Sequence, residues 1–256
     1  MSVDGATSSF ETLTVAEFDS HVHVELARPE KKNAISAATA AELHRVCEHL
    51  ETAPKIVIIS GAGGVFAAGA DIEEMRERRA DDALAGINSR VFRRIHHLPM
   101  PVIAAVDGWA LGGGAELAYA ADFRIASSAA RFGNPEVGLG IAAAAGAAWR
   151  LPALVGESMA MQILLAGRVL DAPAALACGL VHEVVEPEEL LASAVRLAER
   201  IARGSPSAVR LTKALVHAPP SAHPLIDNVA QAVLFETDEK YDRMTAFLER
   251  HRDHTS

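Results

Sequence analysis

The stretch VDGWALGGGAELAYAADFRIA, residues 106–126, decides the fold of this chain. The apolar run that leads into it, residues 101–106, is typical of a buried strand, and an Asp-Gly pair ends that strand. Three glycines at 112–114 permit backbone conformations closed to other residues and a close approach to a ligand. Good helix formers follow from Ala115 onward. We therefore expect the glycines at a helix N-terminus, where unpaired N–H groups and the helix dipole favour negative charge.

Glu116 is the single carboxylate that the glycine turn delivers onto the new helix. The helix end before it can hold an anion or a developing oxyanion. The competing interpretation is a glycine-rich turn that only packs tightly. A triple glycine followed almost at once by a glutamate in apolar surroundings disfavours that interpretation.

A second segment has the same organisation as the first. Residues 55–60, KIVIIS, are typical of a buried strand, a glycine-rich loop follows, and FAAGADI stands at 66–72. We expect Asp71 to start a helix that runs through Met75. The spacing is not that of a P-loop or of GxGxxG, so nucleotide phosphate binding is not predicted. GLGIAA at 138–143 matches GxGxxA, but no apolar strand precedes it, which disfavours a dinucleotide site.

The pattern predicts several further elements. They are a hairpin from 10–18 and 21–26, a helix that Ser36 begins and that ends near Leu50, an amphipathic helix at 81–97, an alanine-rich helix at 142–154, and a long amphipathic stretch at 222–252. In the helix at 81–97, Arg90, Arg93 and Arg94 are expected to face solvent.

Composition narrows the function classes. The chain has 256 residues, half of them hydrophobic, and a formal net charge of −9, which argues against nucleic acid or an anionic membrane as the main partner. Its two cysteines, Cys47 and Cys178, are isolated, so neither a disulfide framework nor a metal site is predicted. The N-terminus has no secretory pattern and no apolar run reaches about 18 residues. We expect a soluble, cytoplasmic protein.

Several motifs in this order resemble the crotonase superfamily and, within it, the enoyl-CoA hydratase/isomerase family. They are RPEKKNA at 28–34, GGVFAAGADIEEM at 63–75, DGWALGGGAELAYAADFRIA at 107–126, RFGNPEVGLG at 131–140, and a closing motif, TDEKYDRMTAFLER, at 237–250. The resemblance implies an α/β fold, a crotonase-like spiral of ββα units with a helical C-terminal region. It also implies two parts: residues 1–195 as the core with the acyl-CoA site, and residues 196–256 as a helical region used for packing and trimerisation.

The resemblance assigns roles to individual residues. It implies that the backbone N–H groups of Ala70 and Gly113 form an oxyanion hole for a thioester carbonyl. It implies that Glu116 orients or deprotonates a water and that Glu136 donates a proton to C2 of the substrate. Substrate and coenzyme A binding is implied for Lys31, Lys32, Ala68, Gly69, Asp71, Ile72, Gly112 and Arg250. No metal and no cofactor are implied, because coenzyme A is part of the substrate.

The implied function is that of an enoyl-CoA hydratase in fatty acid or related acyl-CoA metabolism, acting as a homotrimer or homohexamer. One departure keeps two alternatives open. Where the family has a proline and several glycines after the second glutamate, this chain has IAAAAGAAW at 141–149, and each added methyl group restricts the backbone and fills space. A narrower acyl pocket, or loss of the water that would be added, would favour one of two alternatives. The first is an enoyl-CoA isomerase or another crotonase-type enzyme, and the second is a non-catalytic acyl-CoA-binding protein.

Overall fold

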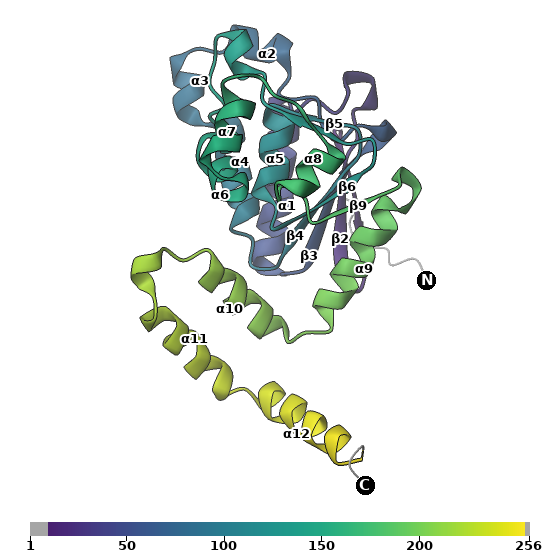
Figure 1. Ribbon diagram of the computed structural model, residues 1–256, viewed down its shortest axis with the longest axis vertical. Coiled ribbons are helices and arrows are strands. Elements are labelled where there is room, and N and C mark those ends of the chain that lie inside the picture. The colour runs from purple at the N-terminus through teal and green to yellow at the C-terminus, as the bar shows by residue number, and fades with distance from the viewer. Residues whose placement is uncertain (1–9, 254–256) are drawn as a thin grey trace. The chain divides into compact units, whose positions relative to one another are not determined.

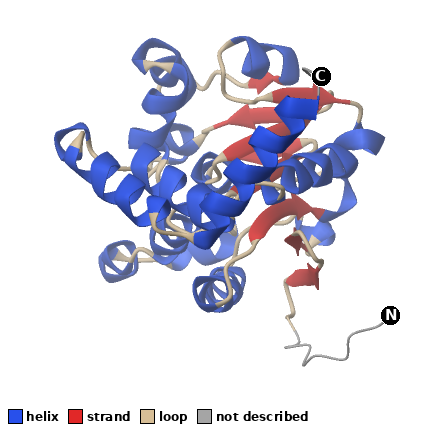
Figure 2. Ribbon diagram, turned by 90° about the horizontal axis from the view of Figure 1, so that it is seen from below, coloured by secondary structure: helices blue, strands red, loops and turns tan. Residues whose placement is uncertain are grey.

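The apolar runs of the sequence become the inner strands of a six-stranded sheet in the computed structural model, which describes residues 10–253. The order across the sheet is β1-β2-β3-β4-β6-β9; β1 is antiparallel to β2 and every other neighbouring pair is parallel. The strands are β1 (Leu13–Glu17), β2 (His21–Leu26), β3 (Ile56–Gly61), β4 (Val102–Val106), β6 (Phe123–Ser127) and β9 (Glu183–Val185). Figure 2 shows these strands as one twisted layer with helices packed against it.

A second, three-stranded sheet has the order β5-β7-β8 and contains β5 (Trp109–Leu111), β7 (Arg131–Gly133) and β8 (Leu170–Asp171). The chain therefore passes twice from a strand of the main sheet to a strand of the small sheet and then to a helix, first through β4 and β5 and then through β6 and β7. An isolated bridge between Ala67 and Ala110 gives the segment after β3 the same course. This repeat confirms the predicted spiral of ββα units.

Among the described residues, nine α-helices begin before residue 200 and three begin after it. They are α1 (Ala37–Thr52), α2 (Ile72–Glu77), α3 (Ala80–Ala85), α4 (Ile87–His96), α5 (Gly113–Ala120), α6 (Ala147–Val155), α7 (Glu157–Leu164), α8 (Ala172–Ala177), α9 (Leu190–Ala202), α10 (Pro206–Val216), α11 (Leu225–Phe235) and α12 (Asp238–Asp253) (Figure 1). Ser36 caps α1 as predicted, because its side chain accepts a hydrogen bond from the Thr39 N–H.

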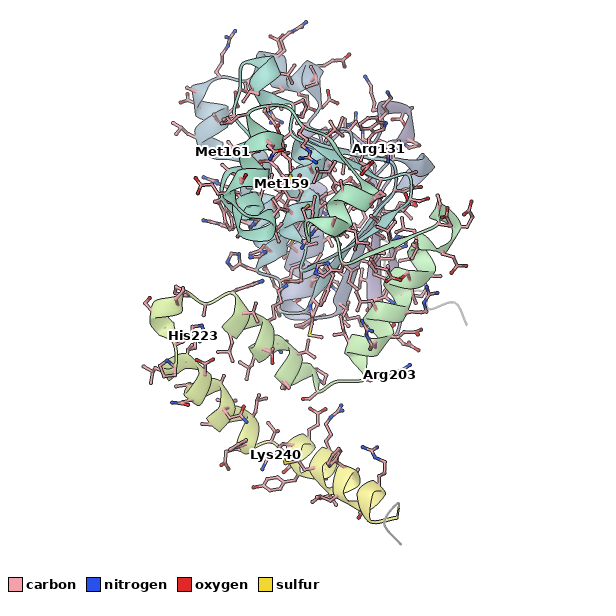
Figure 3. The ribbon with its side chains drawn as sticks, in the orientation of Figure 1. Arg131, Met159, Met161, Arg203, His223 and Lys240 are labelled. Atoms are coloured by element: carbon pink, nitrogen blue, oxygen red, sulfur yellow. The ribbon has the colours of Figure 1, made fainter. Side chains whose placement is uncertain are left out.

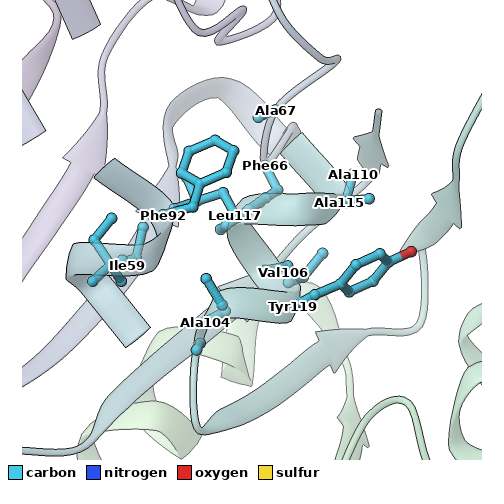
Figure 4. Close-up of a cluster of buried hydrophobic side chains, with 14 of the residues drawn as sticks. Ile59, Phe66, Ala67, Phe92, Ala104, Val106, Ala110, Ala115, Leu117 and Tyr119 are labelled. Carbon is cyan, nitrogen blue, oxygen red and sulfur yellow. The ribbon is translucent and has the colours of Figure 1, made fainter. Parts of the chain in front are cut away.

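Helix α5 is the centre of the hydrophobic core, because all of its residues are buried. Its small and apolar side chains, among them Ala115 and Leu117, pack with Phe66 and Ala67 of the second glycine segment (Figure 4). Burial of this whole helix fixes the turn that precedes it. The core thus supports the glycine turn at residues 112–114.

Three predicted helical stretches were wrong in extent. The helix expected at 81–97 is divided at Gly86, whose φ of 64° lies in the left-handed region and ends α3 before α4 begins. The helix expected at 142–154 begins only at Ala147. The stretch expected at 222–252 is not continuous, because α11 ends before Glu236 and α12 begins at Asp238.

The chain divides into two compact units, Met1–Glu199 and Arg200–Ser256, so the division falls inside α9. In the second unit, the Ser205 hydroxyl donates to Glu239 over 2.5 Å and Arg243 pairs with the same carboxylate over 2.8 Å. Figure 3 labels His223 and Lys240 of this unit; His223 pairs with Asp227, and the Lys240 ammonium lies over the Tyr241 ring. Within residues 10–253, none of the helices is both long and apolar enough to cross a membrane.

Candidate active site

The two glycine segments lie side by side. The Ala67 N–H donates to the Trp109 carbonyl and the Leu111 N–H donates to the Ala67 carbonyl, each over 3.0 Å. These bonds hold the two segments next to each other, so the turn at Ala70 and the turn at Gly113 are neighbours. A β-carbon placed on Gly113 would lie 3.4 Å from the Ala70 nitrogen, so the structure brings the two predicted N–H donors together.

The backbone at both turns requires glycine. Gly112 has a φ of 49° and a ψ of −122°, and Gly69 has a φ of 123°. Gly114 lies so close to the other segment that its β-carbon would overlap the Ala67 carbonyl oxygen. Because Gly113 is the first residue of α5, its N–H has no acceptor within the helix and is available to a ligand.

Glu116 is buried in the first turn of α5, with 3 % of its surface exposed. Its Oε1 accepts hydrogen bonds from the Ala145 N–H over 2.8 Å and from the Ala147 N–H over 3.0 Å. Burial raises the pKa of Glu116 to about 7, against the backbone hydrogen bonds that lower it, and the charge of Glu136 adds to the increase. The carboxyl group can therefore take up and release a proton near neutral pH.

Glu136 begins a short 3₁₀ helix, Glu136–Leu139, and is also buried. Its Oε1 accepts a hydrogen bond from the Asn134 Nδ2 over 3.3 Å, while its Oε2 has no hydrogen-bond partner among the described residues. Burial is the main cause that raises the pKa of this carboxyl group. A β-carbon on Gly112 would lie 3.1 Å from Oε1, which puts Glu136 beside the glycine turn.

Three polar side chains at the site were missed in the sequence. The Tyr119 hydroxyl donates to Asn134 Oδ1 over 3.1 Å, so a buried chain of two hydrogen bonds leads to Glu136. Asn88 is buried, and its Nδ2 lies 3.5 Å from the position of a Gly113 β-carbon. Tyr119 stands three residues after Glu116, on the same side of a helix, which is the signal that could have found it. Asn88 gives no local signal, because only the fold brings it to the turn.

The predicted coenzyme A residues fall into three groups. Ala68, Gly69 and Ile72 lie on the segment that leads into the Ala70 turn, and the Ala68 N–H donates to the Lys32 carbonyl. Lys31 and Lys32 are exposed on the neighbouring loop, where Lys31 pairs with Glu73 over 3.2 Å. Arg250 lies in α12 of the second unit.

Asp71 has a structural role, while its part in binding coenzyme A stays a prediction. It accepts a hydrogen bond from the Glu73 N–H and so caps α2, and its carboxylate pairs with Arg28 over 3.3 Å. The predicted helix start at Asp71 is thereby confirmed. In the described part of the chain, histidine, cysteine and carboxylate side chains form no group of three that could hold a metal ion.

Comparisons with known proteins agree on one family. A family model described as enoyl-CoA hydratase/isomerase matches residues 18–255. The chain is 41% identical to a short-chain-enoyl-CoA hydratase of Clostridium acetobutylicum, over 90% of this chain and 91% of that one, and 39% identical to a crotonyl-CoA hydratase of Syntrophomonas wolfei, over 95% and 97%. It is also similar to the crystal structure of an enoyl-CoA hydratase from Bacillus anthracis, with a TM-score of 0.89 and 32% identity over 94% of this chain and 97% of that chain.

Proposed function

The chain belongs to the enoyl-CoA hydratase/isomerase family, and we propose how its buried carboxyl groups and glycine turns carry out the reaction. It is an enoyl-CoA hydratase, a hydro-lyase that adds water reversibly to a trans-2-enoyl-CoA and gives the 3-hydroxyacyl-CoA. This activity needs a group that activates water, a group that supplies a proton at C2, and a site for the negative charge that develops on the thioester oxygen.

The thioester oxygen accepts hydrogen bonds from the Ala70 and Gly113 N–H groups. Both donors belong to turns that backbone hydrogen bonds hold in place, because the Gly69 carbonyl accepts from the Ile35 N–H and the Gly112 N–H donates to the Gly133 carbonyl. Gly113 also lies at the positive end of the α5 dipole. Donors fixed in advance stabilise the enolate-like oxygen without reorganising as its charge grows. They also withdraw electrons from C3, which makes this carbon open to attack by water.

Water adds between the two glutamates. The Glu116 carboxylate takes a proton from the water while the oxygen of that water bonds to C3. The protonated Glu136 gives its proton to C2. The overall change is the addition of OH to C3 and H to C2, while the two carboxyl groups exchange protonation states. Burial raises the pKa of both groups, and the charge of Glu136 raises that of Glu116 further, which favours a single negative charge on this pair near neutral pH. The Ala145 and Ala147 N–H groups favour the ionised form of Glu116 when it takes part in the reaction. No net oxidation or reduction of the thioester occurs, so the mechanism requires no redox cofactor.

The observation that carries this proposal is the pair of buried glutamates on either side of one glycine turn. The alanine-rich segment supports it further, because residues 142–146 form no α-helix and α6 begins only at Ala147. Its Ala145 and Ala147 N–H groups hold the carboxyl group instead. This arrangement favours hydration over the non-catalytic alternative.

Three wider features are part of the proposal. The second unit exposes a series of apolar side chains, which suits contact with further copies of the chain in a homotrimer or a homohexamer. They are Val216, Leu225, Val229, Val233, Phe235, Tyr241, Met244, Phe247 and Leu248. We also propose that Arg250 and the two lysines contact coenzyme A phosphates, and that the protein acts in the cytoplasm on fatty acid or related acyl-CoA thioesters.

The test is to mix the purified protein with crotonyl-CoA and follow the loss of enoyl-thioester absorbance, with the product identified by mass. We expect 3-hydroxybutyryl-CoA. A 3-enoyl-CoA substrate tests the isomerase alternative in the same assay. Saturable binding of crotonyl-CoA without any product would contradict the proposed hydration and favour an acyl-CoA-binding protein.

A further inference from the structure

A cavity of about 450 Å³ lies on the side of the site formed by α3, α4 and the start of α6. Its lining includes three arginines, Arg90, Arg93 and Arg150, and contains neither aspartate nor glutamate. The chain as a whole has an excess of acidic residues, so this is a local concentration of positive charge. Such a lining attracts an anionic group.

Arg150 is the unusual member of the three. Only 4 % of its surface is exposed, and none of its three guanidinium nitrogens has a hydrogen-bond acceptor among the described residues. Its guanidinium carbon lies 4.2 Å from the centre of the Trp149 ring, and the negative charge of Glu116 acts on it. Burial lowers the pKa of Arg150 to about 10, which leaves the group charged at neutral pH. A buried charge with unmade hydrogen bonds is costly unless a partner arrives.

The cavity adjoins the reaction centre at two residues. Ala145 lines the cavity, and its N–H holds Glu116. On the other wall, Ser89 lines the cavity and directly follows Asn88, which reaches the Gly113 turn. The cavity therefore lies beside the place where the thioester oxygen of a substrate would be held.

We propose that this cavity binds the far end of the acyl chain and that Arg150 pairs with a carboxylate there. The substrate class is then the 2-enoyl-CoA thioesters of dicarboxylic acids, a refinement that rests on the proposed hydratase function. A carboxylate accepts two parallel hydrogen bonds from one guanidinium, which satisfies the donors that Arg150 leaves unmade. Arg90 and Arg93 are exposed and favour entry of the anion.

The test compares two substrates of equal length, trans-2-pentenoyl-CoA and the CoA monothioester of trans-pent-2-enedioic acid. They differ in a terminal methyl group against a terminal carboxylate. We expect the parent protein to have the higher kcat/KM for the dicarboxylic substrate. Arg150→Met should lower the ratio of kcat/KM for that substrate to kcat/KM for pentenoyl-CoA by about 6-fold or more. Arg150→Lys, which keeps the charge, should recover part of the loss.

A second pair of variants covers the case in which Arg150→Met does not fold. Arg93→Gln removes a cation from the cavity, while the matched Arg94→Gln changes the next residue, which pairs with Glu51 instead. We expect only Arg93→Gln to lower the preference for the dicarboxylic substrate, by about 3-fold. Hydration of both substrates with an equal ratio in parent and variants would overturn the carboxylate site and leave the hydratase intact. Hydration of neither substrate would contradict the proposed function and this inference together.

Discussion

Glu116 and Glu136 flank the same glycine turn, but their surroundings differ in kind. Two backbone N–H groups, from Ala145 and Ala147, hold one oxygen of Glu116. One side-chain amide, from Asn134, contacts one oxygen of Glu136, and the other oxygen has no partner among the described residues. Backbone donors fix an ionised carboxylate in one orientation, which suits a group that must aim at a water. An unpartnered oxygen suits a group that must present a proton to carbon.

The largest expected effect comes from removing either carboxyl group. Glu116→Gln and Glu136→Gln should each lower kcat for crotonyl-CoA by about 10²- to 10⁴-fold, because each removes one proton transfer. The double variant should lose little more than the worse single variant, since the two groups act as a unit. Steady-state hydration kinetics measure this, with the exposed Glu157→Gln as the matched control. If either glutamine variant had a kcat within 3-fold of the parent value, that glutamate would not carry out a proton transfer in the reaction.

The second effect is on stability and depends on pH. The pKa of Glu116 is 4.5 without the fold and about 7 within it, so the folded state binds this proton more tightly. The resulting stability is fully present below about pH 4.5 and is lost as the pH rises through about 7. Between pH 5 and pH 8, the free energy of unfolding of the parent relative to Glu116→Gln should fall by about 2 to 3 kcal/mol. Urea denaturation at both pH values tests this, and a difference that rises with pH would be the wrong sign.

The smallest effect concerns Glu136 alone. Asn134→Ala removes a hydrogen bond that favours the ionised carboxylate, so the pKa of Glu136 should increase further. We expect one limb of the pH profile of kcat/KM to move upward, with a decrease in kcat of about 3- to 10-fold. Tyr119→Phe keeps Asn134 but removes the hydroxyl that donates to its Oδ1, so the same limb of the pH profile should move less. A downward shift in Asn134→Ala would contradict the account of Glu136.

The sequence predicted the parts of the site that depend on local chemistry. Both glycine turns were found because glycines that follow an apolar strand and precede a helix indicate a backbone closed to larger residues. Glu116 was singled out because it follows one of these turns closely, and its catalytic role stays a prediction. The helix start at Asp71 was found from the same local pattern.

The parts that depend on contacts across the fold were missed. High alanine propensity predicted a helix from residue 142, but the N–H groups of Ala145 and Ala147 are used by Glu116, some 30 residues earlier in the chain. Arg90 and Arg93 were expected only to face solvent, and nothing in the local pattern indicates that they border a cavity with Arg150. Burial of a single arginine depends on which helices cover it, and a sequence pattern does not contain that information.

The central claim is that Glu136 handles the C2 proton while Glu116 handles the water. The most direct measurement uses butyryl-CoA, which has no double bond to hydrate, and follows by mass the exchange of its C2 hydrogens in D₂O. We predict that the parent and Glu116→Gln both exchange, whereas Glu136→Gln exchanges about 100-fold more slowly. Exchange that survives in Glu136→Gln and is lost in Glu116→Gln would contradict the assignment and reverse the two roles.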